Sequence, residues 1–266
     1  MKMDLQLQGK RALVTGSTAG IGFAIAQRLA KEGAAVIVNG RTEKRVEQAL
    51  SALKKAGVTG KLEGLAADLG TAEGTRTAIA RFPEVDILVN NLGIFEIKPF
   101  EDIPDADWLR LFEVNILSGV RLSRHYMPEM KKRDWGRIVF ISSESAIQIP
   151  AEMIHYGMTK TAQLAIARGL AETTAGTNVT VNSVLAGPTA SEGASNFIEN
   201  LARDQKTTRQ EVEREFFQNM RPTSLLKRMI EPEEVANLVT FVCSPLSAAI
   251  NGAALRADGG VVRSII

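Results

Sequence analysis

The stretch Arg11-Ala-Leu-Val-Thr-Gly-Ser-Thr-Ala-Gly-Ile-Gly22 decides the fold of this chain. Its first five residues predict a strand, and residues 21–32 have the apolar spacing of a helix that Gly33 ends. A glycine-rich turn between a first strand and a helix N-terminus is typical of a site for the phosphates of a dinucleotide. The helix N-terminus adds free N–H groups and the positive end of its dipole. The alternative is a glycine-rich turn with no ligand.

Each glycine of this turn has an expected role. Gly16 permits the tight turn, Gly20 lets the backbone approach the pyrophosphate, and Gly22 lets the helix pack closely on the strand. The residues expected to bind the phosphates are therefore Gly16, Ser17, Thr18, Gly20, Ile21 and Gly22.

Short apolar runs alternate with helical patterns along the rest of the chain. The expected strands are 11–15, 35–39, 61–66, 86–90, 137–142 and 179–184. The expected helices are 21–32, 42–55 with Thr42 as cap, 71–82, most of 104–132, 153–174 and 232–242. This alternation predicts an α/β fold whose parallel sheet has helices on both faces. A TIM barrel alternates in the same way and fits the size. The glycine turn favours a Rossmann-type doubly wound sheet instead.

The domain count follows from length and continuity. The chain has 266 residues and shows no repeat or linker, so we expect a single domain over residues 1–266. Residues 187–222 interrupt the alternation with a polar, helical pattern between a strand and a helix. Insertions of this length are commonly lids over binding sites. The alternative is a pair of solvated surface helices.

Composition excludes several classes of protein and partner. Hydrophobic residues make up 45% and charged residues 23% of the chain, which excludes a disordered chain and a fibre. The 32 Lys and Arg residues exceed the 30 Asp and Glu residues by two, without a charged block. Nucleic acid and an anionic membrane are therefore not expected as partners.

Metal binding and secretion are not expected either. The chain has one cysteine, Cys243, and two histidines, which excludes a disulfide within the chain and the usual multi-cysteine or three-histidine metal sites. The first ten residues lack the apolar core of a signal peptide, and no apolar run approaches the roughly 18 residues that a membrane span needs. We expect a cytoplasmic protein with no metal.

The end of the second strand predicts which dinucleotide binds. NAD sites have an acidic residue here for the ribose hydroxyls, and the sequence is Val38-Asn-Gly-Arg41, without Asp or Glu from Val36 to Thr42. Arg41 is placed to pair with a 2′-phosphate. We therefore expect NADP(H) to be preferred, with NAD(H) possible. The alternative for Arg41 is a surface position at a helix start.

Tyr156 and Lys160 form the candidate catalytic pair. They are four residues apart and so lie on one face of the expected helix. The apolar stripe of that helix is expected to contain Met158, Ala162, Ala165, Ile166, Gly169 and Leu170. The pair lies away from this stripe and is free to face a cleft. The usual tyrosine pKa of about 10 is poorly suited to proton transfer at neutral pH. We expect the lysine ammonium to lower the pKa of Tyr156. The alternative for this pair alone is an amphipathic helix surface.

Other residues agree with this pair in order and spacing. Ser143 ends a strand and precedes Tyr156 by 13 residues. The chain resembles the short-chain dehydrogenase/reductase family over essentially its whole length, through 15–22, Asp68, 90–93 (Asn-Asn-Leu-Gly), Asn115, Ser143, Tyr156, Lys160 and 258–260 (Asp-Gly-Gly). The agreement of all these spacings makes a TIM barrel very unfavourable.

The resemblance implies a role for each catalytic residue. Tyr156 would be the acid/base, and Lys160 would bind the nicotinamide ribose and tune Tyr156. Ser143 would position the substrate carbonyl; Ser142 has the less usual spacing. Asn115 would hold a water in a proton relay to Lys160.

The resemblance also extends the cofactor site. Beside the glycine turn it would include Arg41, Asp68, Leu69, Asn91, Gly93, Tyr156, Lys160, Gly187 and Thr189. Asp68 would contact adenine through its carboxylate and Leu69 through its backbone. Asn91 would lie near the adenine ribose, and the backbone at Thr189 would contact the nicotinamide carboxamide.

Some positions depart from the family pattern. Leu92 replaces the usual alanine, and Ala186 replaces the usual proline before Gly187. Thr18 and Ala19 occupy turn positions where many NADP-dependent members have a basic residue, so the NADP prediction depends on Arg41.

The function expected from these residues is interconversion of a carbonyl and a secondary alcohol of a small molecule by hydride transfer, with NADP(H). The alternatives are an NAD(H)-dependent dehydrogenase of the same family, a non-catalytic NADP(H) sensor, and an isomerase, epimerase or lyase. Sensors tend to lose the tyrosine or lysine, and the last group is longer with different glycine spacing. By resemblance, we also expect a homotetramer or homodimer.

Weaker candidates surround the expected site. Glu144 and His155 flank the catalytic residues and could touch substrate or lie in a solvated loop. An apolar substrate pocket could include Ile94, Phe95, Ile149, Phe197 and Phe216, with ordinary core packing as the alternative.

Overall fold

A parallel sheet of seven strands forms the centre of the structure, a computed structural model that describes residues 3–58 and 60–265. The strand order is β3-β2-β1-β4-β5-β6-β7, and every neighbouring pair is parallel. The strands are β1 (Arg11–Val14), β2 (Ala35–Gly40), β3 (Leu62–Ala66), β4 (Ile87–Asn90), β5 (Gly136–Ser143), β6 (Val179–Ala186) and β7 (Ala254–Ala257). The chain winds outward in both directions from β1 and β4, which confirms the doubly wound Rossmann-type fold.

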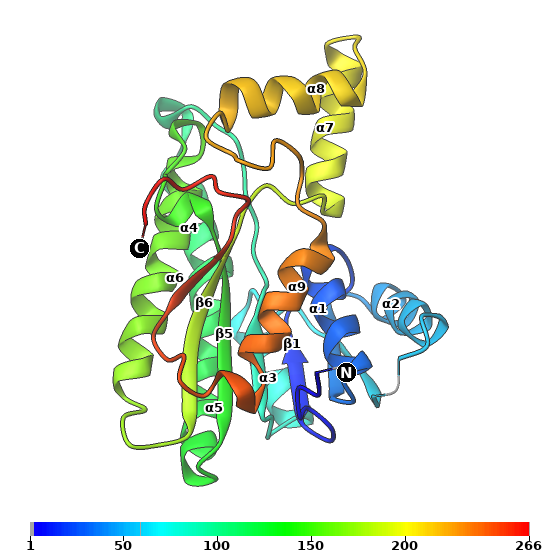
Figure 1. Cartoon of the computed structure of the whole chain (residues 1–266), viewed down its shortest axis with the longest axis vertical. Helices are drawn as coiled ribbons and strands as arrows, with labels where there is room; N and C mark the ends of the chain where they lie inside the picture. The colour runs from blue at the N-terminus through cyan, green and yellow to red at the C-terminus, as the bar shows by residue number, and fades with distance from the viewer. Residues whose placement is uncertain (1–2, 59, 266) are drawn as a thin grey trace.

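Helices cover both faces of this sheet (Figure 1). They are α1 (Gly20–Lys31), α2 (Glu43–Lys55), α3 (Ala72–Arg81), α4 (Asp105–Phe112), α5 (Ser118–Lys132), α6 (Ile154–Glu172), α7 (Glu192–Asp204), α8 (Arg209–Glu215) and α9 (Pro232–Val242). Helices α1 and α9 pack side by side on one face, and α5 and α6 cover the other.

Two hydrophobic layers result from the pleat of the strands. Val14 packs in the layer under α1 and α9, whereas the preceding Leu13 packs in the layer under α5 and α6. Full burial of such a side chain contributes about 1.5–3 kcal/mol. Since both faces are covered, the central strands contain consecutive buried apolar residues, as at 12–14 in β1 and 87–89 in β4.

Local signals fix several helix ends where we expected them. The Thr42 side chain caps α2 by accepting a hydrogen bond from the Arg45 N–H. Helix α9 begins at Pro232, with Glu231 and Glu234 forming a capping box. These ends agree with the sequence because a cap needs only residues within one turn.

Three features of the fold differ from the sequence prediction or add to it. Strand β7, four residues with the sequence Ala-Leu-Arg-Ala at the sheet edge, was not predicted. The helical stretch 104–132 contains a π-helical turn, η2 (Glu113–Leu117), between α4 and α5. The third is the orientation of α6, where the predicted apolar stripe was wrong.

Helix α6 packs on the sheet with a mixed polar face. Its buried residues are His155, Gly157, Thr159, Lys160, Gln163, Ala167 and Ala171. The predicted stripe, which includes Met158, Ala162 and Ile166, is only partly buried. The prediction failed because the polar residues Thr159, Lys160 and Gln163 form hydrogen bonds in the interior. These bonds place them on the buried side of α6.

The insertion 187–222 lies above the carboxyl ends of the strands (Figure 1). It contains α7, α8 and the π-helical turn η5 (Phe216–Met220). With Met229 it forms its own apolar cluster, which contains Ile198, Ala202, Val212 and Phe217. This cluster gives the insertion a core of its own beside the main sheet.

Candidate active site

A cavity of about 370 Å³ lies at the carboxyl ends of the strands, below the insertion. Residues from the glycine turn, the end of β5, helix α6 and the segment after β6 line it. The predicted site residues among them are Gly20, Ile21, Gly22, Asn91, Gly93, Ser143, Tyr156, Lys160, Gly187 and Thr189. The topology thus brings most of the predicted site into one space.

The other predicted site residues are not in the lining of this cavity: Gly16, Ser17, Thr18, Arg41, Asp68, Leu69 and Asn115. Thr18 lines a second, shallow hollow with Arg45. Arg41 and Asp68 are exposed, and an Asp68 carboxylate oxygen accepts a hydrogen bond from the Gly70 N–H at 3.0 Å. Asn115 and Leu69 are buried instead, at 1% exposure each.

The glycine turn has the backbone that its sequence predicts. Gly16 and Gly20 have φ of +61° and +56°, a region that favours glycine. A Cβ on Gly22 would lie 2.5 Å from the Asn91 Nδ2 atom and 2.5 Å from the Gly16 carbonyl oxygen. Asn91 Nδ2 donates to the carbonyl oxygens of Thr15 and Gly16 at 2.9 and 3.1 Å. Asn91 therefore supports the turn.

Asn39 is a second support that sequence reasoning missed. Its side-chain oxygen accepts the Gly16 N–H at 3.0 Å, and its Nδ2 donates to the carbonyl oxygens of Leu65 and Ala67. The Ser17 hydroxyl is buried, donates to the Val14 carbonyl oxygen and accepts the Asn39 N–H. The Ser17 side chain is thus committed to the fold, and so is its backbone N–H, which donates to the Asn39 carbonyl oxygen at 2.9 Å. The signal in the sequence is a polar residue at the end of an apolar strand.

The N-terminus of α1 suits an anion. Ala19 is the N-cap residue, and within the described part of the chain no side chain caps this helix end. The first turn carries no acidic residue, so its N–H groups and dipole face the cavity without a competing carboxylate of their own turn. Together with the close approach at Gly20 and Gly22, this end fits a phosphate group.

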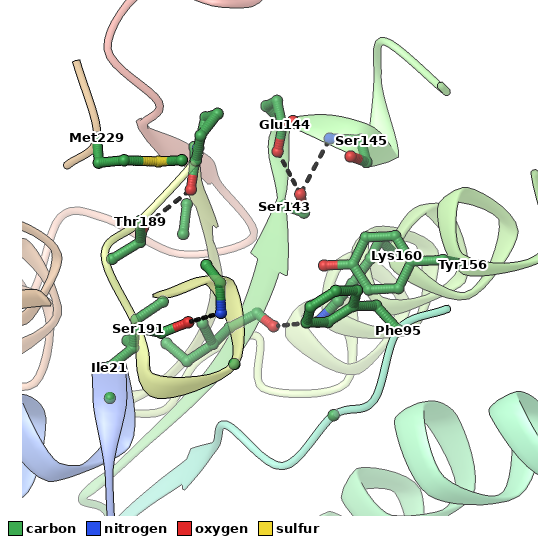
Figure 2. A pocket seen from close by; sticks show the side chains of 18 of the residues that line it. Ile21, Phe95, Ser143, Glu144, Ser145, Tyr156, Lys160, Thr189, Ser191 and Met229 are labelled. Carbon is green, nitrogen blue, oxygen red and sulfur yellow. Dashed lines mark hydrogen bonds between the residues drawn. The ribbon is translucent and has the colours of Figure 1, made fainter. Parts of the chain in front are cut away.

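Tyr156 and Ser143 meet inside the cavity, where Figure 2 shows the tyrosine hydroxyl pointing toward the serine. Burial raises the pKa of Tyr156, and the nearby Glu144 carboxylate raises it further. A hydrogen bond with Ser143 and the charge of Arg221 act in the opposite direction. The expected lowering of this pKa by the lysine is therefore wrong for the protein without ligands, because burial dominates.

Lys160 points past the tyrosine to the backbone of β5. Its Nζ donates to the Ile141 carbonyl oxygen at 2.8 Å and to the Gln163 Oε1 atom at 3.3 Å, and it lies 5.6 Å from the centre of the Tyr156 ring. Burial lowers the pKa of Lys160 to about 8, although Glu144 opposes this shift. A fraction of the lysine is thus neutral near that pH.

Gln163, which sequence reasoning also missed, connects Lys160 to Asn115. This side chain is 1% exposed, and its Nε2 donates to the Asn115 carbonyl oxygen at 2.7 Å. The Asn115 side chain bonds both the N–H and the carbonyl of Ile94, and also Thr159. The amide of Gln163 therefore spans the path between Asn115 and Lys160 where a relay water was expected. A glutamine three residues after Lys160 gives no recognisable signal in one sequence.

A buried ion pair lies beside Ser143. Glu144 accepts a hydrogen bond from the Ser143 hydroxyl, and its other carboxylate oxygen accepts from the Arg221 Nε at 3.0 Å. Glu144 was a weak candidate in the sequence, and Arg221 was missed because 77 residues separate it from Glu144. Both residues line the cavity.

Only some of the apolar candidates for the substrate pocket line the cavity. Ile94, Phe95 and Phe216 line the cavity, and the Phe95 ring lies edge-on to Tyr156 with centroids 6.2 Å apart. Ile149 is exposed and lies outside the lining. The side chain of Phe197 lies outside the described residues. His155 is buried against Trp108 and so does not face the cavity.

The residues that the structure describes contain no group of three or more His, Cys, Asp or Glu side chains able to hold a metal ion. None of the helices in those residues has both the length and the apolar character for a membrane crossing.

Comparison with known proteins agrees with this geometry. A family model described as short chain dehydrogenase matches residues 10–202. An uncharacterized oxidoreductase, YvaG, of Bacillus subtilis (strain 168) is 56% identical over 99% of this chain and 100% of its own length. Dehydrogenase/reductase SDR family member 4 of Bos taurus is 34% identical over 96% of this chain and 88% of its own length.

A solved structure is similar to this chain in its fold. The L-sorbose reductase of Gluconobacter frateurii, complexed with NADPH and L-sorbose, has a TM-score of 0.92 and 30% identity, covering 99% of this chain and 100% of its own. The fold and the cavity define a dinucleotide-binding type of α/β protein. Within that class, the chain belongs to the short-chain dehydrogenase/reductase family, a family of oxidoreductases.

Proposed function

We propose that the chain is an NADP(H)-dependent oxidoreductase that interconverts a carbonyl group and a secondary alcohol, with Tyr156 as acid/base. The observation that carries this proposal is the convergence of Tyr156, Ser143 and Lys160 on one cavity that also reaches the open N-terminus of α1. A proton donor and an anion site in the same space are what hydride transfer to a carbonyl requires.

The cofactor would be held along the carboxyl edge of the sheet. The first turn of α1 would hold the phosphates, Lys160 the nicotinamide ribose, and the backbone at Gly187 and Thr189 the carboxamide. Asp68 and Leu69 would contact the adenine. When bound, the cofactor supplies or accepts the hydride. The solved relative that was crystallised with NADPH supports this assignment.

The protein residues handle the proton. In the reducing direction the Tyr156 hydroxyl gives its proton to the carbonyl oxygen. The Ser143 hydroxyl, whose proton Glu144 accepts in the protein without ligands, would turn to donate to that oxygen. In the oxidising direction Tyr156 takes the proton of the alcohol. Because burial raises its pKa, Tyr156 rests in the protonated form, ready to donate. Positive charge beside the phenol in the loaded site, from Lys160 and an oxidised nicotinamide ring, would favour proton removal.

The preference for NADP(H) depends on Arg41. Arg41 is exposed directly after β2, and the preceding Gly40 packs against Thr18 of the glycine turn, so its guanidinium could pair with a 2′-phosphate. We expect kcat/KM with NADPH to exceed that with NADH by at least about tenfold, since a charge-assisted pair is worth about 1.5–3 kcal/mol. Arg41→Ala should abolish the difference, whereas Arg76→Ala on the exposed face of α3 should keep it. A wild-type preference for NADH would reject this assignment.

We also propose that the chain acts as one domain with residues 187–222 as a lid, in the cytoplasm, as a homo-oligomer. The partly exposed apolar stripe of α6, which includes Met158 and Ile166, supports self-association. Sedimentation as a monomer at micromolar concentration would contradict self-association.

The test of the whole proposed function is NADPH oxidation against a panel of aldehydes and ketones. Tight NADPH binding with no turnover of any carbonyl would instead indicate a sensor.

A further inference from the structure

The buried pair of Glu144 and Arg221 lies in the part of the cavity that a substrate would reach. Glu144 follows β5 directly after Ser143, and Arg221 caps the C-terminal end of η5 in the insertion. Glu144 is 4% exposed to solvent and Arg221 is 6% exposed. Removing two charges from water costs several kcal/mol per ion, which a hydrophobic pair would avoid. A charged pair kept beside a reaction cavity therefore points to a polar ligand.

Glu144 has hydrogen-bonding capacity left in this position. A carboxylate offers about four acceptor sites, of which one is taken by the Ser143 hydroxyl and one by the Arg221 Nε. Because Glu144 lines the cavity, an apolar group beside it would exclude water and return no hydrogen bond. A hydroxyl group in the same place donates to the carboxylate and restores the lost interaction.

The distance from Ser143 limits where that hydroxyl lies on the substrate. Ser143 is the residue assigned to the carbonyl oxygen, and its Oγ is one hydrogen bond away from the Glu144 carboxylate. A substrate whose carbonyl oxygen sits at Ser143 therefore brings the neighbouring carbon within reach of Glu144. Figure 2 shows the Glu144 carboxylate and the Tyr156 hydroxyl on opposite sides of Ser143.

The local charge decides between neutral and anionic substrates. Arg221 Nη1 also donates to the Glu152 carboxylate at 3.1 Å, in addition to the Met220 carbonyl oxygen. One guanidinium thus faces two carboxylates, Glu144 and Glu152, and a protonated Lys160, whose charge interacts with Glu144, brings this set of four groups to a net charge of zero. A carboxylate on the substrate would have to compete with Glu144 and Glu152 for Arg221, which already donates to both.

We propose that Glu144 determines substrate choice and that the substrate is a neutral carbonyl compound with a hydroxyl group on the adjacent carbon, such as a ketose or another α-hydroxy ketone, or the vicinal diol in the reverse direction. This inference rests on the proposed function, since it needs the carbonyl at Ser143. Glu144 accepts the hydrogen bond of the adjacent hydroxyl, and Arg221 holds the carboxylate in place from the insertion.

The test compares kcat/KM with NADPH for three small ketones. Dihydroxyacetone and 3-pentanone have similar size and differ in the two hydroxyl groups next to the carbonyl, and acetoacetate carries a carboxylate. For the wild type we expect dihydroxyacetone to exceed 3-pentanone by about 100-fold, because a site built for a hydroxyl rejects the analogue without it. Acetoacetate should be the poorest of the three. Equal kcat/KM values for dihydroxyacetone and 3-pentanone would overturn the proposal. Absence of turnover with any carbonyl compound would overturn the proposed function itself.

The variant Glu144→Gln supplies a readout that misfolding cannot imitate. It removes one negative charge and leaves Arg221 balanced by Glu152 alone, so kcat/KM for acetoacetate should rise relative to dihydroxyacetone by about tenfold or more. The preference for dihydroxyacetone over 3-pentanone should shrink by a similar factor. Glu101→Gln, on the exposed turn before α4, is the matched control and should behave as wild type. Unchanged ratios in Glu144→Gln would remove Glu144 from this role.

Discussion

The side-chain amide of Gln163 bonds both Lys160 and Asn115. We therefore predict that replacing Gln163 changes both the stability of the protein and the pH dependence of its activity. Gln163→Leu keeps much of the side-chain volume but removes both hydrogen bonds, leaving the Asn115 carbonyl oxygen without its donor and Lys160 Nζ with Ile141 as acceptor. Each buried polar group left unpaired costs about 1–3 kcal/mol. The free energy of unfolding should therefore fall by about 2–5 kcal/mol.

The same change moves the titration of Lys160. Its pKa is about 8, against 10.5 for an unperturbed lysine. The unfolded chain therefore binds more protons between those values, so this group's penalty is fully present below about pH 8 and is relieved as the pH rises toward 10.5. At 1.36 kcal/mol per unit, the penalty is about 3 kcal/mol. Loss of the Gln163 acceptor disfavours the ammonium, which lowers the pKa of Lys160 further.

The assay is the pH profile of kcat/KM together with urea unfolding. For the wild type we expect activity to fall on the alkaline side with an apparent pKa near that of Lys160. Gln163→Leu should shift this limb to lower pH, and Gln163→Glu, which adds a carboxylate beside the ammonium, should shift it to higher pH. Gln210→Leu on the exposed face of α8 is the matched control. The same alkaline limb in all four proteins would refute the reasoning, whatever the change in stability.

Three further predictions follow from other parts of the structure. Gly22→Ala should weaken NADPH binding at least tenfold in a fluorescence titration, because its Cβ would clash with Asn91 Nδ2 at 2.5 Å; unchanged affinity would contradict the tight turn. The Cys243 thiol should resist iodoacetamide at pH 8 until urea unfolds the chain, since burial raises its pKa to about 12; rapid native labelling would show that it is accessible. Tyr126→Phe should lower the free energy of unfolding by about 1–3 kcal/mol, because the Tyr126 hydroxyl donates to the buried Phe82 carbonyl oxygen at 2.8 Å; unaltered urea stability would oppose this.

The parts of the fold that the sequence predicts well depend on local signals. The start of α1 follows from the glycines of its turn, and α2 and α9 begin at a side-chain cap and at a proline with a capping box. In each case the residues that set the boundary lie within one turn of it. The order of the strands then follows from the doubly wound topology.

The parts that were missed depend on pairing between distant residues. β7 has the sequence Ala-Leu-Arg-Ala, which lacks β-branched residues, and it forms a strand because β6 offers it an edge. The sheet-facing side of α6 was misassigned because hydrogen bonds of Gln163 and Thr159 with the η2 turn make a polar face the buried one. Periodicity cannot reveal partners that are more than 40 residues away.

The candidate site divides in the same way. Tyr156, Lys160 and Ser143 could be predicted because their spacing along β5 and α6 fixes where they meet. Arg221 could not, because its partner Glu144 belongs to a segment 77 residues away in the chain. The pKa of Tyr156 was predicted with the wrong sign for the same reason, since burial and Glu144 raise it only once the cavity is formed and outweigh the opposing Ser143 and Arg221.

The most direct measurement of the central claim follows a deuterium label from NADPH deuterated at the transferring position of C4 into the product alcohol. The wild type should place the label on the carbinol carbon. Tyr156→Phe should bind NADPH with similar affinity, yet form labelled alcohol at least about a thousandfold more slowly, because the carbonyl oxygen lacks its proton donor. Labelled alcohol produced by Tyr156→Phe at the wild-type rate would contradict the account.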